Sequence, residues 1–449
     1  MLNMPDSVPA GLVKDLRQSL SSPVYLILYG IAMLLIGILY MGTENTVVFG
    51  LQIPLFLFLI PLRASMTVAS DTHPRGNNFM QLTALSSREI VWGVMLSSLL
   101  QLLITAFLIA LIIALLSLDP NPSTAARIGT YWEGLAGCII GGALMTGLLM
   151  LAARVSLLFR MGAAFVLMMG ACAVFSSSMR EESWWIWPML VGNAVIFLFV
   201  LVEFARRCYA SPSENTTRVA RILMLTPLAI YVVLQLAGVE QNAAVTQLVF
   251  GCWIAFVGAT LDIALPITFL PQHNKAAVRW LPKVLRKPGV PQASLFLFLV
   301  AALTAACLSW GGMELFHVSI DNMTEEAFLD VIPAEMLSSW QLQVSVGVPV
   351  KWLFSVLVTV LALDFIRKRT NPNRLLYFGI VAVSLLLLGI VVNSYVRIES
   401  MWPYSCLLNV PSYFLSLEGF KKCMNVLTLT NSVSFLGSVL ILFIVFKKR

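Results

Sequence analysis

Few residues in this sequence have a type and position that could support chemistry, and Asp262 is the clearest of them. It lies well inside a long apolar stretch. A carboxylate in a membrane span costs roughly 2.5–3.5 kcal/mol on insertion scales, so we expect it to face protein or water. Asp262 could contact a proton or a substrate. It could equally be neutral, or accept hydrogen bonds from Thr260 or Thr268 near the membrane surface.

The motifs of the common catalytic sites are missing. No G-x-x-x-x-G-K-[ST] loop occurs, so the chain has no such cradle for ATP phosphates. The sequence shows neither metal-ligand spacing nor a Ser/His/Asp arrangement. Its three histidines are dispersed, at His73, His273 and His317. We therefore expect no enzyme activity, no metal and no cofactor in this chain.

The composition is that of a membrane protein. Of the 449 residues, 59% are hydrophobic and 11% charged, whereas soluble domains have about 25% charged residues. These values exclude an ordinary soluble enzyme and a disordered chain, and seven cysteines are too few for a disulfide-stapled secreted domain. The net charge is +7, but the basic residues form no block with interleaved aromatic residues. We therefore expect no nucleic-acid partner.

About twelve segments are long and apolar enough to cross a membrane as helices, which takes about 20 residues each. The predicted fold is therefore all-α and polytopic. The expected spans are Val24–Met41, Val47–Ala64, Ile90–Leu118, Gly134–Ala153, Met161–Ser178, Trp184–Phe204, Ile222–Ala237, Val245–Leu270, Leu295–Trp310, Val348–Ile366, Leu375–Val396 and Thr430–Phe446.

The basic residues predict the orientation of these spans. With the N-terminus in the cytoplasm, 23 of the 29 Lys and Arg residues flank spans on the cytoplasmic side, as the positive-inside rule favours. Both termini are then cytoplasmic. The first apolar run has span length and no cleavage site follows it, which predicts a retained signal-anchor. Glu203 beside Arg206 and Asp364 beside Arg367 predict interfacial ion pairs.

The spans divide into two halves of six, residues 1–208 and 209–449. In both halves the second span is followed by the longest cytoplasmic loop of that half, over residues 63–89 and 271–293. This layout predicts a tandem parallel duplication.

Two expected extracytoplasmic loops are long, Gly311–Gly347 and Arg397–Leu429. The first is acidic. The second contains Cys406 and Cys423, which could form a disulfide that closes the loop in an oxidising compartment.

The stretch after the second span has the most specific local pattern. Gly76 breaks the chain, and apolar residues then recur at about helical spacing, at Phe79, Leu82 and Leu85. This predicts a short helix over residues 78–85 with one apolar face. Ser86 followed by Glu89 is a capping box that begins the third span. Such a helix could pass a push from a cytoplasmic partner into the membrane, or be an ordinary interfacial helix without a partner.

This segment resembles the cytoplasmic loop of ABC-2 type transporter permeases, in which a Leu-rich short helix precedes a Ser-Arg-Glu-Ile type start of the third span. The resemblance covers about residues 10–120 and includes an amphipathic helix before the first span. Ala84 and Val94 depart from the family, which often has Pro and Lys there, and the loop 271–293 lacks the pattern. The matching residues are Asp71, Arg75, Gly76, Leu82, Leu85, Ser86, Arg88, Glu89, Ile90 and Gly93.

The resemblance implies a permease subunit in the plasma membrane of a bacterium, surrounded by lipid, alone or as a homodimer. A separate ATPase subunit would bind ATP and magnesium and power export of a hydrophobic, amphipathic or glycosylated substrate. The 78–85 helix would be the coupling helix. The residues implied in coupling are Arg75, Gly76, Phe79, Leu82, Leu85, Ser86, Arg88 and Glu89.

Two other functions remain open. An ion-coupled secondary carrier would need Asp262, although so few intramembrane charges disfavour it. An intramembrane lipid or glycan transferase would hold its site in the long outer loops, but those loops show no carboxylate and histidine arrangement to support it.

Overall fold

The structure is a computed structural model of the whole chain, and it describes a set of segments that are nearly all helical. Clustering of contacts divides the chain into two compact units. Unit 1 comprises residues 1–184 and 197–215, and unit 2 comprises residues 185–196 and 216–449. The described residues are 27, 29–31, 33–34, 36, 52, 54–72, 87–116, 122–151, 186–207, 217–239, 241–268, 290–321, 342–343, 345–347, 349–354, 356–358, 428–429 and 431–442.

The described segments contain six helices that are long and apolar enough to cross a membrane, and no strand. The chain is therefore a helical, multi-pass membrane protein. Each of the six overlaps an expected span; the total of twelve and the cytoplasmic termini stay predictions. The six are Ser87–Leu115, Tyr131–Leu151, Pro188–Arg206, Arg218–Leu236, Thr246–Ile263 and Gln292–Trp310.

Several helices extend beyond the predicted ends of their spans. Helix α4 (Ile60–Thr72) continues past Ala64, so the first part of the expected cytoplasmic loop is helical. Helix α7 (Pro122–Leu151) begins before Gly134, and α13 (Val290–Asp321) continues through the start of the expected outer loop at Gly311. The expected spans mark only the apolar region, whereas the backbone hydrogen bonds of a helix can continue beyond it.

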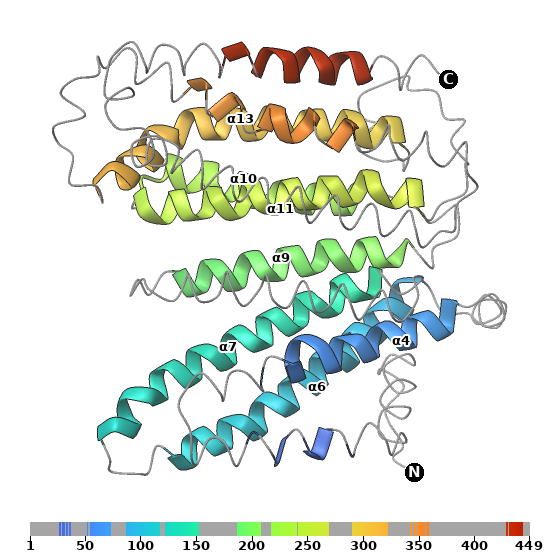
Figure 1. Cartoon of the computed structure of the whole chain (residues 1–449), viewed down its shortest axis with the longest axis vertical. Helices are drawn as coiled ribbons and strands as arrows, with labels where there is room; N and C mark the ends of the chain where they lie inside the picture. Colours follow the sequence, from blue (N-terminus) through green and yellow to red (C-terminus); the bar gives the residue numbers. More distant parts are fainter. Residues whose placement is uncertain are drawn as a thin grey trace, which may run out of the picture. The chain divides into compact units, whose positions relative to one another are not determined.

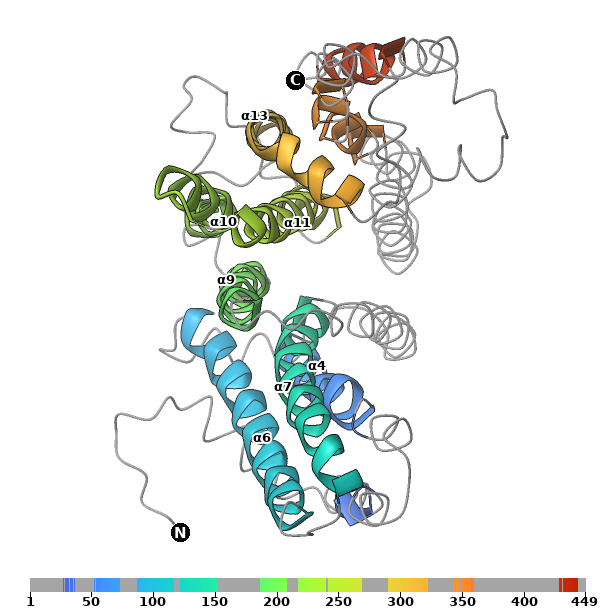
Figure 2. The ribbon, with the colours of Figure 1, turned by 90° about the vertical axis from the view of Figure 1, so that its left-hand side faces the viewer.

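Unit 1 is built on α4, α6 (Ser87–Leu116) and α7, which pack against one another (Figures 1 and 2). The chain enters α4 through a π-helix, η1 (Pro54–Leu59), which also packs on α7. Such a wide turn is rare, and the sequence did not indicate it. Apolar side chains from η1, α4 and α7 form a buried cluster of Leu57, Leu62, Met145 and Leu149.

Unit 2 is built on α10 (Arg218–Leu236), α11 (Gln241–Thr268) and α13. Helix α11 packs on both of the others, as Figure 2 shows in nearly end-on view. Helices α10 and α11 are joined by a short turn in which Gly238 has a φ of 64°, a left-handed conformation that favours glycine. The short turn makes α10 and α11 an antiparallel hairpin.

The packing of α7 against η1 can be tested by substituting a glycine at their contact. A Cβ at Gly142 would lie 2.8 Å from the Phe56 carbonyl oxygen, a backbone atom that cannot rotate away. We expect Gly142→Ala to lower the free energy of unfolding of the detergent-purified protein by about 1–3 kcal/mol, since overpacking forces the helices apart. Gly192→Ala on α9 (Ile186–Arg206) is the control, because nothing lies within 4 Å of its Cβ. Equal stability of both variants would contradict this account.

Candidate functional site

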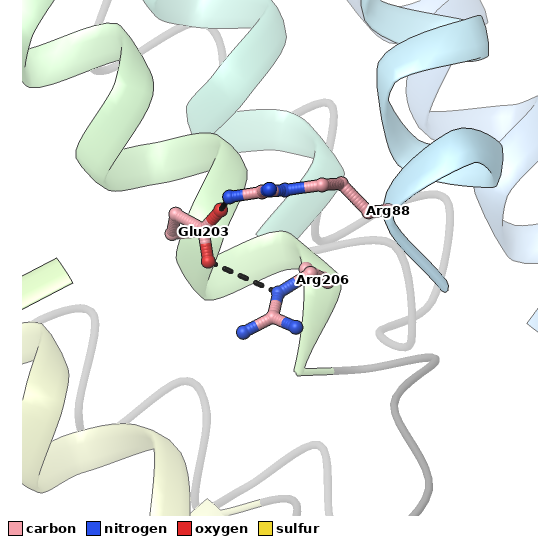
Figure 3. A network of polar contacts seen from close by, with 3 residues as sticks. All are labelled: Arg88, Glu203 and Arg206. Atoms are coloured by element: carbon pink, nitrogen blue, oxygen red, sulfur yellow. Dashed lines mark hydrogen bonds and ion pairs between the residues drawn. The ribbon is translucent and has the colours of Figure 1, made fainter. Parts of the chain in front are cut away.

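Three charged side chains meet where α6 begins and α9 ends. Arg88, in the first turn of α6, donates a hydrogen bond from a guanidinium nitrogen to Oε1 of Glu203 at 2.9 Å. Arg206, in the last turn of α9, donates from Nε to Oε2 of the same carboxylate at 3.0 Å. Figure 3 shows Glu203 between the two arginines. The ion pair that the sequence predicts between Glu203 and Arg206 is present, and the structure adds Arg88 to it. We call these three residues the Glu203 network.

The Glu203 network has a buried centre and an exposed edge. The side chain of Glu203 is 6% exposed, that of Arg206 13%, and that of Arg88 59%. Two guanidinium groups on one carboxylate leave a net charge of about +1.

Aromatic packing continues the contact between α6 and α9 deeper into the helix pair. Trp92 is four residues after Arg88 and Phe199 is four residues before Glu203, so both lie one turn further along their helices. Their ring centroids are 5.1 Å apart and the rings are tilted. The matched spacing shows that these ends of α6 and α9 run antiparallel, with the charged contact at one end.

Asp262 forms a separate ion pair with an arginine in unit 2. Arg221 of α10 donates from Nε to Oδ2 of Asp262 on α11 at 2.7 Å, and the two side chains are 0% and 1% exposed. The guanidinium also lies over the ring of Phe296 on α13, 5.2 Å from its centroid. Thr260 donates its hydroxyl to the Phe256 carbonyl instead, and the side chain of Thr268 lies outside the described residues.

The Arg221–Asp262 pair affects the stability of the folded protein most when only one of its two members is removed. Removing one member of a buried ion pair typically costs about 3–5 kcal/mol, because the other charge is left without compensation in a low-dielectric surrounding. Replacing both by apolar residues is often neutral. The pair therefore contributes most by fixing which residues must lie together.

A neutral polar cluster lies further along the same helices of unit 2. Asn193 of α9 and Gln247 of α11 exchange hydrogen bonds through their amide groups, at 2.8 and 3.2 Å. Gln247 also donates to the carbonyl oxygen of Pro227 in α10 at 3.0 Å. The cluster thus satisfies buried amides that would otherwise be costly in an apolar environment.

The structure places some of the predicted site residues and not others. Arg88 and Glu89 lie in the first turn of α6. Six residues implied in coupling lie outside the described residues, as do both cysteines of the predicted disulfide. These are Arg75, Gly76, Phe79, Leu82, Leu85, Ser86, Cys406 and Cys423. Within the described segments no group of three or more metal-ligating side chains occurs.

Sequence reasoning missed Arg221 as the partner of Asp262. By position alone, at the start of an expected span, Arg221 fits an ordinary flanking charge. The signal was available, however: Arg221 is the fourth residue of α10, and Asp262 lies six residues before the end of α11. In an antiparallel hairpin these two positions lie at similar depth and can meet.

Comparison with protein-family models, with curated proteins and with solved structures found no match to this chain.

Variants of the Glu203 network test whether a buried charged group contributes more to stability than an exposed one. We expect Glu203→Gln to lower the free energy of unfolding by about 1–3 kcal/mol, because it removes the buried acceptor of two charged donors. Arg88→Gln should change it by about 1 kcal/mol or less, because an exposed ion pair contributes little in water. Thermal unfolding of the purified variants measures both. A Glu203→Gln variant as stable as the unaltered protein would show that the network does not stabilise α6 against α9.

Proposed function

We propose that this protein is the transmembrane permease subunit of an ABC-2-like, ATP-driven exporter that works with a separate ATPase subunit. The observation that supports the proposal most directly is the Glu203 network. It lies at the N-terminal end of α6, immediately after the segment that resembles a coupling helix. A force applied to that segment would therefore reach a helix that is already connected to α9.

The proposed mechanism is mechanical. Helix α6 has 30 residues and is about 45 Å long, enough to extend through the apolar core and both interfaces. A push on residues 78–85 from an ATPase that closes on ATP would tilt α6 at its cytoplasmic end. Glu203, hydrogen-bonded to Arg88, would carry α9 along with it. The spans themselves would do no chemistry.

The exposure of Arg88 suits this role. Its side chain is largely open to solvent while its guanidinium contacts a buried carboxylate. An exposed ion pair of this kind is worth little and is easily rearranged, so it can change partner or geometry during a cycle. The rest of the α6–α9 contact, with Trp92 against Phe199, is apolar and keeps the two helices together meanwhile.

Asp262 gives little support to the alternative of an ion-coupled carrier. Its carboxylate is fully buried and bound to a guanidinium that stays protonated, so it offers no open position for a proton or a cation. The carrier alternative requires Asp262 to exchange with the solution. Helices α10, α11 and α13 would first have to separate. The transferase alternative depends on outer loops beyond the described residues and gains no support.

The coupling segment can be tested by association. The full-length chain, tagged and extracted from its native membranes, should co-purify with a polypeptide that becomes labelled by 8-azido-ATP. The double variant Leu82→Asp/Leu85→Asp should release that polypeptide, because charge on the apolar face would prevent docking.

The matched control is Met80→Asp/Ala84→Asp. It adds the same charge to the opposite face of the expected helix, so association should remain. Absence of any labelled companion, or full association after the change at Leu82 and Leu85, would end the proposal.

A further inference from the structure

Helices α10 and α11 are held together at one end by the Arg221–Asp262 pair. Both side chains are completely enclosed, and the 2.7 Å contact joins a residue near the start of α10 to one near the end of α11. Sliding or rotating one helix by a single residue would separate the charges in an apolar surrounding, where each alone is strongly unfavourable.

The two helices are closely packed in the next part of the same interface. A Cβ at Gly258 would lie 2.5 Å from the sulfur of Met224, and one at Gly251 would lie 3.3 Å from the backbone nitrogen of Leu228. Between these glycines, Ala255 is fully buried. Small residues on one face of α11 thus let the two backbones approach closely over about two turns.

Gln247, one turn before Gly251 on α11, adds a polar contact to the same stretch of α10. Its amide donates to the Pro227 carbonyl of α10 and exchanges hydrogen bonds with Asn193 of α9. The polar residues of α11 that fix its position, Gln247 and Asp262, are therefore separated by fifteen residues, or about 22 Å of helix.

Helix α13 is attached to the same pair of helices. Phe296 covers the guanidinium of Arg221 at 5.2 Å, and the hydroxyl of Tyr231 on α10 donates to the Cys307 carbonyl oxygen at 3.5 Å. Both contacts fall on α10 residues that are fully buried.

We propose that the Arg221–Asp262 pair is a register lock, which fixes α10, α11 and α13 as one rigid body within unit 2. It acts by charge pairing in a closed, apolar site. It is neither a proton site nor a substrate site. This inference does not rest on the proposed function, since it concerns helices that any function would have to move together.

A first experiment tests whether the pair depends on complementary charge. Asp262→Asn and Arg221→Leu should each lower the thermal midpoint of the purified full-length chain by more than about 5 °C, because each removes the oppositely charged group beside a buried charge. The swap Arg221→Asp/Asp262→Arg and the apolar pair Arg221→Leu/Asp262→Leu should each recover at least half of that loss. Arg218→Leu is the matched control: it removes an exposed arginine one turn earlier in α10 and should leave the midpoint unchanged.

A second experiment reads the register directly. An ideal Cβ at position 258 lies 3.7 Å from the Cβ of Met224, a separation suited to a disulfide. In Met224→Cys/Gly258→Cys, with a protease site inserted at the Gly238 turn, an oxidant should link the two fragments after cleavage. Linking should be several-fold slower when Asp262→Asn is added, and unchanged when Arg218→Leu is added.

Two results would overturn the proposal. One is a swap and an apolar pair that are both as unstable as the single variants, since complementarity would then not matter. The other is linking between positions 224 and 258 that proceeds at the same rate with and without Asp262, since the pair would then not hold the register.

Discussion

The low polarity of the membrane interior governs where this protein can place charge. A carboxylate or guanidinium there needs a partner, and single hydrogen bonds are insufficient for a full charge. Both charged contacts considered above place a buried carboxylate against a guanidinium group. Each joins a residue near the beginning of one helix to a residue near the end of another, within one unit. Antiparallel helices bring such ends together, so the same helix pairing that buries the charged groups also gives each its partner.

Neutral polar residues follow a different rule. Buried hydroxyls at Thr105, Thr146, Thr260 and Thr304 each donate to the carbonyl four residues earlier in their own helix. Such a bond satisfies the hydroxyl without requiring another helix. Amides have too many donors and acceptors to be satisfied locally, so Gln247 bonds to Asn193 and Pro227 instead. Among these residues, contacts between helices are thus specified by the amides and charges more than by the threonine hydroxyls.

The helical segments were predictable from the sequence because crossing the apolar core requires an apolar run of fixed length. The ends were less predictable, as at α4 and α13, because a helix does not stop where its apolar run stops. The η1 turn was missed because every residue in it is apolar, so periodicity cannot distinguish a π-helix from an α-helix. Glu203 with Arg206 was predictable as a pair three residues apart on one helix. Arg88 with Glu203 was not, since that contact depends on which helices pair. Arg221 with Asp262 was missed, although pairing the two consecutive spans as an antiparallel hairpin brings these positions together.

The two charged contacts differ in a way that suits different tasks. Arg88 keeps most of its surface in solvent, so its bond to Glu203 can be broken and remade with water as the temporary partner. Arg221 has no such access, and separating it from Asp262 would require α10, α11 and α13 to move apart. Under the proposed function, the adjustable contact is the one at the start of α6, where force would enter. Under the proposed role of the Arg221–Asp262 pair, α10, α11 and α13 would move together as one rigid body.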